Sequence, residues 1–142
     1  MQIEFLFMKK LFSIRYSDNG ISFAALILRI TLGIIMLPHG FSKLMSFATR
    51  SGTFADPFHI GSTPSLCLAI FAEVFCSVFV ILGLFTRFAC IPLIIDIAVA
   101  LGYVEHWQLF GSGEKAVIYL AGFVSLLFMG PGKVSIDRFI GK

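Results

Sequence analysis

The sequence predicts an all-α fold, a four-helix transmembrane bundle in which residues 1–142 form a single domain. Two observations predict it. First, 58% of the 142 residues are hydrophobic and 13% are charged, whereas about a quarter of the residues in a soluble domain are charged. Second, four long apolar segments follow one another, and such segments satisfy their own backbone groups in lipid as helices. They take up most of the chain, so we expect no separate soluble catalytic domain.

The four expected helices run over residues 22–44, 65–85, 88–104 and 114–130. A helix rises about 1.5 Å per residue, so around twenty residues cross the hydrocarbon layer. The third and fourth segments are shorter, and we expect them to stand nearly upright or to have snorkelling polar flanks. No cleavable signal is evident, and either Met1 or Met8 is a possible start, because Met8 precedes two lysines as in many bacterial starts.

The basic residues predict the orientation of these helices. Three fall on one side of the expected membrane: Lys43, Arg50 and Lys115. Seven fall on the other: Lys9, Lys10, Arg15, Arg87, Lys133, Arg138 and Lys142. By the positive-inside rule, both termini are expected in the cytoplasm, with Tyr103 and Trp107 at the outer interface.

The composition disfavours several kinds of site. The net charge of +3 is small and the basic residues are scattered, so we expect no nucleic-acid binding. Cys67, Cys76 and Cys90 all lie in apolar segments, without a CxxC pair or a histidine at metal-ligand spacing. We expect these cysteines to be inert, and we expect no metal site.

The stretch 46–64 is long for a loop in such a short chain. It contains Phe47, Phe54, Phe58 and Ile60, which would gain nothing in a free loop. We expect it to fold back over the outer mouth of the bundle as a short interfacial helix. The alternative is a disordered outer loop.

Three ionisable residues fall deep within the apolar segments. Charge at membrane depth is costly, so Arg29, Glu73 and Asp96 are expected to face the bundle interior and to pair or line a site. Their depths favour pairing of Arg29 with Asp96, which Glu73 can join. Two roles stay open: a buried ion pair that holds the bundle together, or a proton-accepting carboxylate, for which Glu73 is the better candidate.

A second polar group is expected at the outer end of the bundle. On an ideal helix, Gly33, Gly40 and Lys43 lie close to the line of Arg29, and the glycines permit close helix approach. The residues that can converge beside them are His39, Lys43, Glu105, His106, Glu114 and Lys115, with Asp56 and His59 in the loop. Histidine near carboxylates exchanges protons at ordinary pH. The alternative is solvated charge at the membrane surface.

Six stretches also resemble a known family when their order and spacing are taken together. They are 29–33 (RITLG), 39–44 (HGFSKL), 72–73 (AE), 82–87 (LGLFTR), 113–116 (GEKA) and 130–137 (GPGKVSID). This pattern is similar to that of the DoxX family of small bacterial membrane proteins. The resemblance implies four transmembrane helices in the bacterial inner membrane. It also points to Arg29, His39, Lys43, Glu73, Arg87 and Glu114.

The resemblance further implies a redox role, because relatives include subunits of a thiosulfate:quinone oxidoreductase and others are tied to thiol-redox complexes. We therefore expect a quinone-linked or thiol/sulfur-redox membrane oxidoreductase, or a subunit of one, with a redox partner protein and a possible homo-oligomer in the lipid bilayer. The expected catalytic residues are Glu73, His39 and Glu114. The expected cofactor-binding residues, for a quinone, are Arg29, Gly40 and Lys43. The alternative is a non-enzymatic scaffold or a small transporter whose intramembrane charges are structural.

Overall fold

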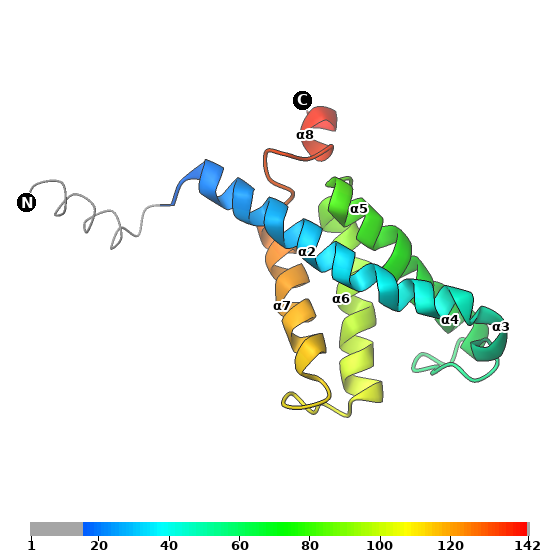
Figure 1. Ribbon diagram of the computed structural model, residues 1–142. Coiled ribbons are helices and arrows are strands. Elements are labelled where there is room, and N and C mark those ends of the chain that lie inside the picture. The colour runs from blue at the N-terminus through cyan, green and yellow to red at the C-terminus, as the bar shows by residue number, and fades with distance from the viewer. Residues whose placement is uncertain (1–15, 142) are drawn as a thin grey trace, which may run out of the picture.

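The structure, a computed structural model, describes residues 16–141 and shows only helices and connecting segments there (Figure 1). The first long helix is α2 (Asp18–Met45). The second is continuous and consists of α4 (Ser62–Ile70), η1 (Phe71–Cys76) and α5 (Ser77–Leu82), and the third consists of α6 (Thr86–Val99) and η2 (Ala100–Val104). The last is α7 (Glu114–Met129). Two short helices complete the order, α3 (Phe47–Arg50) and α8 (Asp137–Ile140). The all-α prediction is confirmed for these residues.

Three of these helices are long and apolar enough to cross a membrane: Asp18–Met45, Ser62–Leu82 and Thr86–Val104. They coincide broadly with the first three expected segments. The fourth, α7, has 16 residues and is about 24 Å long, shorter than a bilayer's hydrocarbon core of about 30 Å. It is an apolar C-terminal helix that packs beside α6 and against α2. Its crossing of the membrane stays a prediction.

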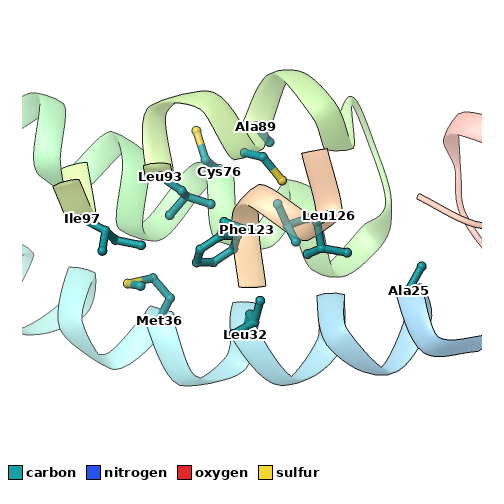
Figure 2. Close-up of a cluster of buried hydrophobic side chains, with 11 residues drawn as sticks. Ala25, Leu32, Met36, Cys76, Ala89, Leu93, Ile97, Phe123 and Leu126 are labelled. Carbon is teal, nitrogen blue, oxygen red and sulfur yellow. The ribbon is translucent and has the colours of Figure 1, made fainter. Parts of the chain in front are cut away.

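The core lies where α2, α6 and α7 meet (Figure 2). Leu32 and Met36 from α2 face Leu93 and Ile97 from α6, and Phe123 from α7 fills the space between them. Such side chains interdigitate at close-packed density, so they hold the three helices in one arrangement. Cys76 and Cys90 are buried in the same core as small apolar side chains.

Two glycines bring α2 against the helix 62–82. A β-carbon on Gly33 would lie 3.1 Å from the carbonyl oxygen of Ser77, and one on Gly40 would lie 2.6 Å from Val74 Cγ2 and 2.9 Å from Glu73 Cβ. Neither position has room for a side chain. The expected close approach at Gly33 and Gly40 is therefore confirmed, and it places α2 directly beside Glu73.

The segment after α2 folds back onto the bundle, as expected. It forms the short helix α3, and Phe47 and Phe54 pack against a second cluster of Leu66, Ile70 and Val74. Phe58 and Ile60 remain exposed. The segment 46–61 thus covers one end of the bundle, which we call the loop end.

Much of the remaining surface is apolar. Ile34, Phe75, Phe88 and Phe128 are all more than half exposed. Large apolar surfaces of this kind do not suit water, but they suit the interior of a bilayer. Tyr103 and Trp107 are exposed at the loop end, where interfacial aromatic residues are typical.

Candidate functional site

The central feature of the site is an ion pair between α2 and η1. Lys43 Nζ lies 2.6 Å from Glu73 Oε1 and 2.5 Å from Glu73 Oε2, so the ammonium donates to both carboxylate oxygens. The Lys43 side chain is 20% exposed and that of Glu73 is 7% exposed. It is the one salt bridge within the described part of the chain. The close approach at Gly40 brings the two helices near enough for it to form.

Asp96 completes a group of three charged residues. It lies on α6 and lines the same cavity as Lys43 and Glu73, near enough for both to act electrostatically on its carboxyl. Glu73 and Asp96 lie at a similar level in the bundle because a short turn joins their helices. Glu73 lies nine residues before Leu82, and Asp96 lies ten residues after Thr86. We call Lys43, Glu73 and Asp96 the charged cluster.

The charged cluster lines a cavity of about 540 Å³. Its walls come from the helix 62–82, from the helix 86–104 and from the segment 50–58 that covers the loop end. Apolar side chains make up most of the lining: Phe54, Ala55, Pro57, Phe58, Leu68, Ala69, Phe71, Ala72, Pro92, Ile95, Val99, Ala100 and Val104. Arg50 and Glu105 line it at the loop end. A few polar groups in an apolar cavity are typical of a small-molecule site.

Both π-helical segments border this cavity. Glu73 lies in η1, and Ala100 and Val104 lie in η2. A π-helical turn widens the helix locally and is found frequently at functional sites. Both π-helical segments therefore contribute to the cavity walls, while Cys76 at the end of η1 also belongs to the core.

Asp56 anchors the loop that covers the cavity. Its Oδ1 accepts hydrogen bonds from the Ser65 hydroxyl at 2.9 Å and the Ile60 amide at 3.0 Å, and its Oδ2 accepts one from the Gly61 amide at 2.7 Å. Partial desolvation opposes ionisation, but the bonds from Gly61, Ser65 and Ile60 outweigh it and hold the pKa of this carboxyl below its usual value. Asp56 thus has a structural task next to the cavity.

Arg29 lies at the opposite end, where its guanidinium binds the segment after α7. Its Nη1 donates to the carbonyl of Pro131 at 2.5 Å and its Nη2 to that of Val134 at 2.8 Å. The residue is 1% exposed. The expected pairing of Arg29 with Asp96 is wrong, because Arg29 lies at the level of Gly83 in the turn before α6, whereas Asp96 lies ten residues after the start of that helix. Arg29 also does not line the cavity.

Asp137 closes the same end. Its Oδ1 accepts from the Phe85 amide at 2.6 Å, and its Oδ2 accepts from the amide and the hydroxyl of Thr86, each at 3.0 Å. A carboxylate at a helix N-terminus satisfies free amides and favours the helix dipole. Its own amide donates to the Gly83 carbonyl at 2.8 Å. The C-terminal segment is thereby tied to the turn before α6.

The other expected site residues lie outside the cavity. His39 is exposed on α2 and its ring faces Tyr119 of α7 edge-on, with 6.1 Å between the ring centroids. Glu114 is exposed in the first turn of α7. The expected convergence at the loop end therefore extends to Lys43 and Glu105 but not to these two residues. Within residues 16–141, no three His, Cys, Asp or Glu side chains are placed to hold a metal ion.

Comparison with known proteins identifies the family to which this chain belongs. The family model described as DoxX matches residues 24–107, more than half of the chain. This chain belongs to the DoxX family. It is therefore an integral membrane protein embedded in a lipid bilayer. The match includes all three members of the charged cluster.

Individual relatives extend this DoxX assignment over most of the chain. The inner membrane protein YphA of Escherichia coli is 29% identical over 140 residues, which cover 89% of this chain and 98% of the relative. An uncharacterized membrane protein of Mycobacterium tuberculosis is 29% identical over 130 residues, 81% of this chain and 80% of the relative. An uncharacterized protein of Haemophilus influenzae is 28% identical over 122 residues, 78% and 86% respectively. No solved structure gives a significant match.

Five of the six stretches that resemble DoxX proteins gather at two places in space, while 113–116 lies at the start of α7. Residues 82–87 and 130–137 meet around Arg29 and close the C-terminal end. Residues 39–44 and 72–73 supply Gly40, Lys43 and Glu73 beside the cavity. The first group has bonds that are explained by folding alone, whereas the second places charge on an apolar cavity. The cavity is therefore the candidate functional site of this DoxX protein.

Proposed function

We propose that this DoxX-family protein binds a quinone in its cavity and acts as the quinone-binding subunit of a membrane oxidoreductase. The observation that carries the proposal is the position of Lys43, Glu73 and Asp96 on the wall of a mostly apolar cavity. The apolar walls suit a ring, and the charged cluster supplies the few hydrogen-bonding groups that would orient it.

Each member of the cluster has a distinct part in the proposal. The Lys43 ammonium has three N–H donors and donates two hydrogen bonds to Glu73, so it has capacity to donate to a quinone oxygen. Phe71 and Pro92 border the same space and offer flat apolar contacts to a ring. Asp96 and Glu73 line the same cavity, so their carboxyls supply further hydrogen-bonding groups beside a bound ring.

Charge balance supports a proton-exchanging role. One ammonium and two carboxylates carry a net charge of −1, which is costly among apolar walls. One bound proton makes the cluster neutral. Reduction of a quinone to a quinol takes up two electrons and two protons. In this proposal the cluster donates one proton to the ring oxygen that it holds, and water at the cavity mouth supplies the second proton and then restores the proton of the cluster. The electrons come from a separate donor, which the proposal takes to be a partner redox protein.

The proposal includes the topology. α7 is the fourth crossing, since it packs beside α6 and exposes Ile118 and Phe128. With both termini in the cytoplasm, the loop end and the cavity mouth face the outer side. The relation to an inner membrane protein of Escherichia coli supports the bacterial inner membrane as the location.

The same ion pair also favours a second candidate function, that of a non-enzymatic scaffold or assembly subunit. The bond between Lys43 and Glu73 joins α2 to η1, and a structural role explains it without any ligand. In that case the cavity holds ordinary lipid.

Binding of a quinone by the purified protein in nanodiscs distinguishes the quinone-binding subunit from the scaffold. A redox-inactive quinone analogue should bind saturably, and Glu73→Gln should weaken it. Glu114→Gln is the matched control, since Glu114 is exposed and lies outside the cavity. Equal binding by both variants and the wild type would show that the charged cluster does not bind the quinone. A lack of saturable binding would favour the scaffold.

A further inference from the structure

A shallow apolar groove lies beside the cavity on the outer face of α6 and η2. It has a volume of about 430 Å³ and is lined by Pro57, Ile95, Ala98, Val99, Gly102, Tyr103 and Trp107. The helical residues follow spacings of three and four, so they form one stripe. From residue 95 to residue 103 the stripe is roughly 12 Å long at a helical rise of about 1.5 Å per residue.

The groove adjoins the cavity. Pro57, Ile95 and Val99 line both, so they form the border between the two spaces. Ile95, at this border, is 50% exposed. Ala98, by contrast, lines the groove alone. The border between the cavity and the outer face of α6 therefore consists of apolar side chains.

The far end of the groove depends on an unusual local backbone. His106 and Trp107 have φ angles of 47° and 58°, a region that non-glycine residues seldom adopt. This turn places the Trp107 indole against Gly102, where a β-carbon would lie 2.9 Å from Trp107 Cζ2. Gly102 and the turn together hold a large aromatic side chain along the groove, although much of that side chain stays exposed.

We propose that cavity and groove form one site for a lipid-soluble amphiphile with an apolar tail. Its polar head lies at Lys43, Glu73 and Asp96, and its tail crosses Ile95 and Val99 to lie along Gly102 and Trp107. The inference rests on the proposed quinone site and specifies the substrate class: a tailed quinone rather than a water-soluble one. The shared lining by Pro57, Ile95 and Val99 is the observation that assigns the tail to this groove.

Trp107 makes the inference directly measurable, because it is the only tryptophan of the chain. The full-length protein in nanodiscs is titrated with a quinone that carries bromine atoms on its tail, which quench indole fluorescence on close contact. The expected result is saturable quenching of Trp107 that an unbrominated tailed quinone relieves. Binding of the head is followed separately with a tailless quinone analogue.

Two variants of matched size locate the tail. Ala98→Phe fills the groove without touching the cavity, so saturable quenching should be lost while the tailless analogue still binds. Ile91→Phe adds the same ring at an exposed position of α6 outside the groove and should change neither. A brominated phospholipid should quench the wild type and Lys43→Met equally, whereas quenching by the quinone tail should lose its saturable part in Lys43→Met.

The outcomes separate the two proposals. If the tailless analogue binds but quenching by the brominated tail never saturates, or survives Ala98→Phe, the tail lies elsewhere and only the groove inference fails. If quinone and phospholipid tails behave alike in every variant, the groove holds ordinary lipid. If no quinone binds at all, the proposed function fails and takes this inference with it.

Discussion

Lys43 and Glu73, thirty residues apart, meet because their side chains lean in opposite senses along neighbouring helices. In a helix each side chain leans towards the helix N-terminus. Lys43 lies in the last turn of α2 and so reaches back into the bundle, whereas Glu73 leans towards the loop end. Nζ comes within 2.6 Å of Oε1 as a result. Gly40, one turn below Lys43, lets the two backbones lie close enough for the contact.

The first prediction concerns the stability of this pair. Lys43→Met should lower the free energy of unfolding by about 3 kcal/mol, because it leaves a carboxylate buried without its partner. Adding Glu73→Gln to Lys43→Met should recover part of that loss, since it removes the uncompensated charge. Unfolding in detergent gives the measurement. Lys115→Met, at an exposed residue, is the control. A double variant as unstable as the sum of both single variants would rule out coupling between the residues.

A second prediction concerns Arg29. Arg29→Lys keeps the charge but loses the fork that binds two carbonyls at once, so we expect a loss of about 2 kcal/mol in unfolding free energy. Protease access to residues 130–137 should rise as well, because those carbonyls hold the C-terminal segment in place. Arg50→Lys is the control, since the Arg50 side chain is exposed and donates no hydrogen bond to the described residues. Equal unfolding free energies and equal protease access in the two variants would contradict this role of Arg29.

The fold was largely predictable because its signals are local and strong. The apolar lengths predicted the helices, and the spacing of Gly33 and Gly40 predicted a close helix contact. The apolar residues of 46–64, among them Phe54, predicted a loop that folds back. In each case the relevant property belongs to a short stretch of sequence.

The pairings were harder to predict, for a physical reason. Counting residues from the start of each apolar segment gives a common level only if the helices begin at the same level. α2 begins at Asp18 and has 28 residues, and Arg29 lies level with Gly83, whereas Asp96 lies ten residues into α6. The acceptors of Arg29 are backbone carbonyls, which leave no trace in residue identity. The lean of helical side chains does predict that Lys43 reaches inward, and that signal was available in the sequence.

A third prediction tests the contact that positions the cluster. Gly40→Leu should destabilise the protein by about 3 kcal/mol and weaken quinone binding, because the added side chain collides with Val74 and Glu73 and moves α2 away. Gly52→Leu is the matched control, since a β-carbon at Gly52 meets no atom within 4 Å. Thermal unfolding and analogue binding are measured together. If Gly40→Leu kept the thermal stability and the analogue affinity of the wild type, the contact between α2 and the helix 62–82 would tolerate a side chain at this position.

The fourth prediction concerns pH and the loop anchored by Asp56. Hydrogen bonds hold the pKa of this carboxyl below its unfolded value, so its stabilising effect is present above about pH 3.9 and is lost as the pH falls through the lower folded pKa. Amide exchange of residues 58–63 should therefore accelerate in strong acid. In Asp56→Asn the exchange should be faster at neutral pH and should lose this acid step. If amide exchange in Asp56→Asn showed the same acceleration in acid as the wild type, groups other than Asp56 would cause that acceleration.

The last prediction sets the cavity against the other polar residues expected to act. His39 faces Tyr119 and lies outside the cavity lining, as does Glu114. If the charged cluster is the site, His39→Ala and Glu114→Gln should leave analogue affinity within about twofold, since substitutions away from such features have effects of about 0.5 kcal/mol. Asp96→Asn should change the pH dependence of binding, because it removes one of the two carboxyls that we propose as carriers of the exchangeable proton. Comparison of all three variants across pH makes the measurement. A large loss in His39→Ala with an unchanged Asp96→Asn would move the site from the cavity to the α2–α7 surface.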